Sequence, residues 1–135
     1  MGNLKILVVD DEQDMRIFVS TVVETLGFEA IAAQDGVEAL EKARNNPPAL
    51  LILDVMMPQI DDGIQTYRQF RTDQDLAAIP IIMLSAIAKK TFLHSIKMLS
   101  PQQGSPMPEP EAYMEKPPDA NELSRLITEL LKPDS

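Results

Sequence analysis

LKILVVDDE, residues 4–12, is the stretch that decides how this chain of 135 residues folds. Its first six residues are mostly apolar and several are β-branched, which predicts a strand over residues 4–9 that is buried on both faces. Three acidic residues then end the strand. A second stretch, ALLILDV at residues 49–55, has the same form and contains a single acid, Asp54. Strands of this kind are typical of a parallel sheet covered by helices on both faces.

Segments with helical and strand periodicity alternate along the rest of the chain. Apolar residues recur at helical spacing over residues 12–26, and Gly27 stands where a left-handed helix end favours glycine. The same patterns predict strands at 28–33, 79–84 and 112–115, helices beginning near Gly36, at 64–71, at 89–99 and from Asp119, and a loop at 58–63. Five strands alternating with five helices predict an α/β fold with a parallel sheet and right-handed crossovers.

Composition restricts the class of protein. Lys and Arg number 12 and Asp and Glu number 21, so the net charge of −9 has the wrong sign for neutralising a phosphate backbone. The chain has no cysteine, which excludes disulfides and thiolate metal sites. No apolar run approaches the roughly 18 residues of a membrane span, and the first apolar stretch is too short for a signal peptide. We therefore expect a cytoplasmic protein with neither a nucleic-acid nor a membrane partner.

Polar residues follow the predicted strands at their carboxyl ends, and these ends meet at the edge of a parallel sheet where ligands bind. They are Asp10 and Asp11, Asp54, Ser85 and Lys116. Carboxylates this close repel one another by up to about 4 kcal/mol per pair, and oxygen ligands alone favour Mg²⁺. Taken alone, Asp11 fits the cap of the following helix equally well, whereas Asp54 precedes no obvious helix.

Four motifs resemble those of the receiver domain of bacterial two-component response regulators. They are KILVVDDE at 5–12, LLILDVMMP at 50–58, LSA at 84–86 and YMEKPP at 113–118. The resemblance implies a flavodoxin-like, doubly wound sheet with strand order 2-1-3-4-5. It also implies a phosphoprotein of a phosphorelay, which receives a phosphoryl group from a sensor histidine kinase or a phosphotransfer protein. Such a domain signals to a downstream target protein by changing its conformation and is not an enzyme in the usual sense, although it catalyses its own phosphorylation and dephosphorylation.

The resemblance assigns roles in binding and sensing the phosphoryl group. The position of Asp54 implies the phosphoacceptor, and the positions of Lys116 and Ser85 imply the groups that bind the phosphoryl oxygens. A carboxylate can attack phosphorus once nearby cations neutralise the phosphoryl charge, which agrees with this assignment. Ser85 and Tyr113 match the family's switch residues. The family pattern is also compatible with a weak homodimer.

The resemblance further implies a Mg²⁺ cofactor and a pair of residues that control how long the phosphoryl group lasts. The implied metal ligands are Asp10, Asp11, Asp54 and the backbone carbonyl of Met56. Side chains two positions after the acceptor and two after the hydroxyl residue flank the path of the attacking water, and here they are Met56 and Ile87. Neither side chain can orient a water molecule, which predicts slow spontaneous dephosphorylation.

Three features depart from the family pattern. Glycine usually stands eight residues after the acceptor, but here Asp62 holds that place and Gly63 follows, which predicts a longer loop. A Pro-rich segment, residues 100–111, is an insertion of unassigned role that can be neither helix nor strand interior. Only residues 132–135 follow the last helix, so we expect a single receiver domain over residues 1–135 with no output domain.

Two other functions fit part of the pattern. Phosphatases of the haloacid dehalogenase type also form an aspartyl-phosphate with Mg²⁺, but they need a second acid two residues after the nucleophile, where Met56 stands here. A degenerate receiver that acts only as a binding module is the other alternative, and the intact acids, Ser85 and Lys116 count against it. His94, the one histidine, is interpreted as a surface residue of a helix rather than as a phosphoryl donor.

Overall fold

The computed structural model describes residues 4–55, 60–99 and 108–131, and within these ranges five strands alternate with five helices. The strands are β1 (Lys5–Val9), β2 (Glu29–Ala33), β3 (Leu50–Asp54), β4 (Ile81–Ser85) and β5 (Ala112–Glu115). The helices are α1 (Gln13–Thr25), α2 (Gly36–Asn45), α3 (Ile60–Thr72), α4 (Lys89–Leu99) and α5 (Ala120–Leu131). All strands are parallel in the order β2-β1-β3-β4-β5, which confirms the predicted flavodoxin-like sheet.

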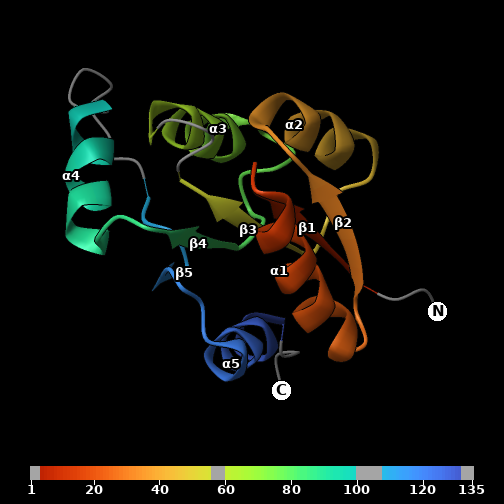
Figure 1. The fold of residues 1–135 in the computed structure, drawn as a ribbon. Coiled ribbons are helices and arrows are strands. Elements are labelled where there is room, and N and C mark those ends of the chain that lie inside the picture. Colours follow the sequence, from red (N-terminus) through yellow and green to blue (C-terminus); the bar gives the residue numbers. More distant parts are fainter. Residues whose placement is uncertain (1–3, 56–59, 100–107, 132–135) are drawn as a thin grey trace.

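Two apolar cores cover the two faces of the sheet, because successive side chains of a strand point to opposite faces. Ile6 and Val8 pack with residues of α1 and α5, whereas Leu7 and Val9 pack with residues of α2, α3 and α4. Figure 1 shows α1 and α5 on one side of the sheet and α2 and α3 on the other. Burial of each Val, Leu or Ile side chain stabilises the folded state by about 1.5–3 kcal/mol. The many buried side chains of the strands therefore make the sheet a rigid support for the residues at its edge.

The ends of α1 decide between two interpretations of the acidic pair. Glu12 is the residue that caps the amino end of α1, and it does so without a side-chain hydrogen bond, so the interpretation of Asp11 as the cap is wrong. At the other end Gly27 has a φ of 93°, a left-handed conformation that favours glycine, as the sequence predicts. Asp11 is therefore available for chemistry at the sheet edge.

The predicted loop at 58–63 is wrong over residues 60–63, which form the first turn of α3. The reason is Gly63, where an added Cβ would lie only 1.7 Å from the carbonyl oxygen of Val55. Glycine therefore lets α3 begin close against the end of β3, although periodicity alone interprets it as a loop residue. Residues 56–59 lie outside the described part of the chain.

The remaining segments agree with the predictions made from turn and breaker residues. Helix α5 begins after Asp119, whose carboxylate accepts a hydrogen bond from the Glu122 N–H at 2.8 Å. Of the Pro-rich segment, residues 108–111 are described and form no helix, whereas residues 100–107 lie outside the described part. No helix in the described ranges combines the length and the hydropathy needed to cross a bilayer.

Candidate functional site

Four carboxylates gather at the carboxyl edge of the sheet, where β1 and β3 run side by side. Ligand oxygens of Asp10, Asp11, Glu12 and Asp54 all lie within 4.8 Å of one another. Asp10 and Asp54 are only 2% and 3% exposed, whereas Asp11 and Glu12 reach solvent. Because buried charges need compensation, this cluster requires positive charge close by.

Lys116 supplies one positive charge to this cluster. Its Nζ lies 3.1 Å from Asp10 Oδ2, 3.2 Å from Glu12 Oε1 and 3.3 Å from Asp54 Oδ2. Burial disfavours the charged amine, but the attraction of Asp54 and Asp10 outweighs it and raises the pKa of Lys116. One lysine against four acids leaves the cluster negative, so the site retains the capacity to bind a cation.

The backbone after β5 brings Lys116 into this position. The Lys116 N–H donates to the Ser85 carbonyl at 2.7 Å, which continues the pairing of β5 with β4 by one residue. The peptide bond to Pro117 is cis. Arg16 donates to the backbone carbonyl of Asp10 at 2.8 Å and so ties α1 to the end of β1.

Ser85, Ile87 and Tyr113 form a hydrogen-bonded group beside the acids. The buried Ser85 Oγ accepts from the Ile87 N–H at 3.1 Å, and the Tyr113 hydroxyl donates to the Ile87 carbonyl at 2.8 Å. Burial raises the pKa of Tyr113, although a hydrogen bond with Ser85 acts in the opposite direction. The tyrosine ring packs against Phe92 of α4 with the ring centroids 5.5 Å apart. In this structure Tyr113 therefore already lies inward, toward the loop between β4 and α4.

The structure brings together most of the residues selected from the sequence. They are Asp10, Asp11, Asp54 and Lys116 in one cluster, with Ser85, Ile87 and Tyr113 beside it. Met56 lies outside the described residues, so neither its carbonyl nor its side chain is placed. Glu12 is the functional candidate that sequence reasoning missed, and its position directly after the acidic pair was the available signal. His94 is exposed on α4, as predicted.

Comparison with known proteins decides which family this geometry belongs to. The family described as "Response regulator receiver domain" matches residues 6–100, which is most of the chain. The chain belongs to the response regulator receiver family. It is thereby assigned to two-component signalling, and its acidic pocket is typical of a phosphoacceptor switch rather than of a conventional enzyme. The phosphatase family considered above is not the one that matches.

Relatives of this receiver domain include both long and short proteins. The alkaline phosphatase synthesis transcriptional regulatory protein PhoP of Bacillus subtilis is 36% identical over 130 residues, covering 96% of this chain but 49% of its own length. The chain thus spans about half the length of this curated relative, and a third of several others. The polar-differentiation response regulator DivK of Brucella ovis is 32% identical over 111 residues, covering 82% of this chain and 81% of its own length.

Solved structures agree with this assignment. The chemotaxis response regulator CheY4 of Vibrio cholerae superposes with a TM-score of 0.78 at 27% identity, covering 96% of this chain and all of that one. A putative response regulator from Chloroflexus aurantiacus gives a TM-score of 0.76 at 28% identity, covering 98% of this chain and all of that one. The likeness therefore extends over the whole sheet and its helices.

Proposed function

We propose that this receiver domain accepts a phosphoryl group on Asp54 from a sensor histidine kinase or a phosphotransfer protein. The observation that carries the proposal is the position of Asp54, 3% exposed and 3.3 Å from Lys116 Nζ in a cluster of four acids. During transfer the Asp54 oxygen forms a bond to phosphorus while the bond from phosphorus to the donor imidazole breaks. Lys116 then lies where it can stabilise the charge on the phosphoryl oxygens.

We propose Asp10, Asp11 and Asp54 as ligands of Mg²⁺, together with the backbone carbonyl of Met56. The three carboxylates fit this ion because their oxygen atoms lie within 4.8 Å of one another. Bound Mg²⁺ supplies charge neutralisation at the phosphoryl oxygens. Glu12 has a different role in this proposal, since its Oε1 lies 3.2 Å from Lys116 Nζ and helps to hold the lysine beside Asp54.

The hydrogen bonds of Ser85 supply the link from the phosphoryl group to the signalling conformation. A Ser85 hydroxyl that turns toward a phosphoryl oxygen moves away from the Ile87 N–H, to which it is now bonded. The Ile87 carbonyl, in turn, accepts a hydrogen bond from the hydroxyl of Tyr113. Occupation of the site therefore changes the loop that positions Tyr113 and favours a different population of states.

Acetyl phosphate tests the phosphoacceptor proposal without a cognate kinase. With Mg²⁺ present, intact-mass spectrometry should show the addition of one phosphoryl group, and Asp54→Asn should abolish it. Asp62→Asn is a matched control, because it makes the same chemical change at an exposed acid of α3 and should label like the parent. Failure of the parent to be labelled would instead support the binding-module alternative.

We also propose that Ile87 and Met56 slow the loss of the phosphoryl group. Ile87 is only partly buried and packs against the core beside Ser85, so its alkyl side chain borders the site without offering a hydrogen bond to water. Met56→Asn combined with Ile87→Glu should accelerate decay of the phosphorylated protein after the donor is removed. Decay at the parental rate would show that other groups control the access of water.

A further inference from the structure

Two side chains of α3 hold a strap, residues 108–111, which is the described end of the Pro-rich segment. The Tyr67 hydroxyl donates to the Pro108 carbonyl, and the Arg71 guanidinium donates to the Glu109 carbonyl at 3.3 Å. Tyr67 is fully buried, and burial raises the pKa of its hydroxyl, so this donor keeps its proton at neutral pH. The strap is therefore held by a group that belongs to the core of the molecule.

The end of the strap is also hydrogen-bonded to the first residue of β4. Glu111 Oε1 accepts from the Ile81 N–H at 2.7 Å and from the Arg71 guanidinium at 2.7 Å. An amide exchanges its hydrogen with water when the hydrogen bond that protects it opens locally. Hydrogen exchange at Ile81 therefore reports whether the strap is in place.

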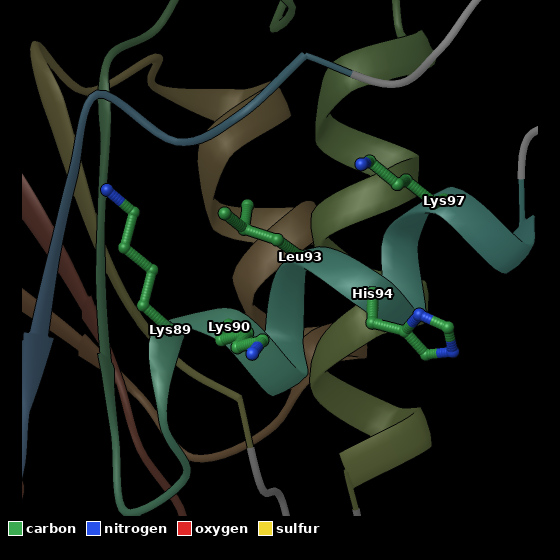
Figure 2. A pocket seen from close by; sticks show the side chains of 5 residues that line it. All are labelled: Lys89, Lys90, Leu93, His94 and Lys97. Carbon is green, nitrogen blue, oxygen red and sulfur yellow. The ribbon is translucent and has the colours of Figure 1, made fainter.

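Aromatic rings connect the strap to Tyr113 through the core. The rings of Tyr67 and Phe92 are nearly perpendicular with centroids 5.6 Å apart, and Phe92 packs against Tyr113 at 5.5 Å. The side chains drawn in Figure 2 line the outer groove of α4, whereas Phe92 of the same helix is fully buried. Because a close-packed core transmits displacements, a movement of Tyr113 alters the packing of Phe92 and, through it, that of Tyr67.

We propose that the strap is a second output of the receiver switch, held while Tyr113 lies inward and loosened when Tyr113 turns outward. This coupling rests on the proposed role of Tyr113 as a switch residue. An outward turn removes a ring from beside Phe92, which weakens the packing that sets the Tyr67 hydroxyl against the Pro108 carbonyl. By linkage, a strap that is held in place favours the inward position of Tyr113 to the same extent.

Hydrogen exchange in the intact protein, measured by NMR, tests this coupling without a phosphoryl group. Tyr113→Ala removes one ring contact and should accelerate exchange at Ile81 by about three- to tenfold. Met114→Ala is the matched control, because it truncates the next side chain of β5, which packs on the opposite face of the sheet. It should change exchange at Ile81 by less than about twofold. Exchange at Ile52, in the middle of β3, monitors global unfolding in both variants.

A second variant tests the coupling in the opposite direction and leaves the aromatic contacts in place. Tyr67→Phe keeps the ring beside Phe92 but removes the hydroxyl that holds the strap, and exchange at Ile81 should accelerate by about two- to tenfold. The backbone amide resonance of Tyr113 should shift as well. Thr72→Val removes an exposed hydroxyl from the same helix and should leave both readouts unchanged.

Beryllofluoride, a phosphoryl mimic, distinguishes failure of the coupling from failure of the phosphoacceptor proposal. Bound at Asp54 with Mg²⁺, it should favour inward Tyr113 and slow exchange at Ile81 at least about twofold. The coupling would be overturned by a shifted Asp54 amide with unchanged exchange at Ile81, by equal exchange in Tyr113→Ala and Met114→Ala, or by an unshifted Tyr113 amide in Tyr67→Phe. An Asp54 amide that does not shift would instead contradict the phosphoacceptor proposal, and the variants alone would then decide the coupling.

Discussion

Two nearly buried cations lie at opposite edges of the sheet and differ in what surrounds them. Lys116, 12% exposed, lies at the carboxyl edge among the carboxylates of Asp10, Glu12 and Asp54. Arg71, 4% exposed, lies near the amino ends of β4 and β5. Its guanidinium donates to the carbonyls of Ala77, Ile79 and Glu109, to the hydroxyl of Tyr67 and to the carboxylate of Glu111.

Charge balance distinguishes a structural cluster from a site that can bind a ligand. Arg71 has one carboxylate partner and several neutral acceptors, so the positive and negative charges in this cluster balance. Its burial lowers the pKa, but the bonds with Tyr67 and Glu111 outweigh this and raise it. The cluster around Lys116 contains more acids than cations and therefore has room for a further positive charge. A count of buried charges, rather than burial itself, thus identifies the functional edge.

The largest expected loss of stability comes from removing the Arg71 guanidinium from its charge-balanced cluster. Arg71→Met should lower the free energy of unfolding by about 3 kcal/mol, because Glu111 and several buried acceptors lose their donor. Urea denaturation measures this, and Mg²⁺ should not restore the loss. A change of less than about 1 kcal/mol would show that Arg71 behaves like an exposed ion pair.

Lys116→Met makes the matched change at the functional edge and should cost less, about 2 kcal/mol in the presence of a chelator, because two of the four acids reach solvent. Added Mg²⁺ should restore more stability to this variant than it adds to the parent, since the vacated cluster is more negative. Urea denaturation with and without Mg²⁺ gives both numbers. An equal or smaller gain in the variant would contradict the unbalanced charge of this edge.

Alkaline pH should produce the smallest effect, because burial cancels part of the attraction that Lys116 feels. The pKa of Lys116 is raised above its usual value of 10.5, so the folded state holds this proton more tightly than the unfolded state does. The resulting stabilisation is complete below pH 10.5 and is lost as the pH rises through the raised pKa. The difference in unfolding free energy between the parent and Lys116→Met should therefore be constant near neutral pH and shrink above pH 10.5. A difference that grows with pH has the wrong sign for this account.

Local signals in the sequence sufficed for the sheet and for most of the functional edge. Apolar runs such as residues 5–9 and 50–53 form buried strands, and acids directly after them have to lie at the edge where parallel strands end. Gly63 was misinterpreted because its close approach to Val55 is a tertiary contact with no trace in the helical periodicity. The strand ends were therefore predictable, but the start of α3 was not.

The Arg71 cluster had no local signal at all. It joins α3 to the end of the Pro-rich segment, and the Tyr67 hydroxyl donates to the Pro108 carbonyl while Arg71 bonds Glu109 and Glu111. These partners lie about forty residues apart in the chain, and backbone carbonyls leave no pattern in side-chain sequence. Family resemblance does not help either, because this segment is where the chain departs from the family pattern.

Locating the phosphoryl group tests the central claim most directly. After reaction with acetyl phosphate and Mg²⁺, borohydride reduces an aspartyl-phosphate to homoserine, and peptide mass spectrometry then locates the altered residue. The account predicts homoserine at position 54 alone, with none in a sample that was treated with a chelator before the reaction. Homoserine at Asp10, Asp11 or Asp62, or equal modification without Mg²⁺, would contradict the assignment of Asp54 as the acceptor at this edge.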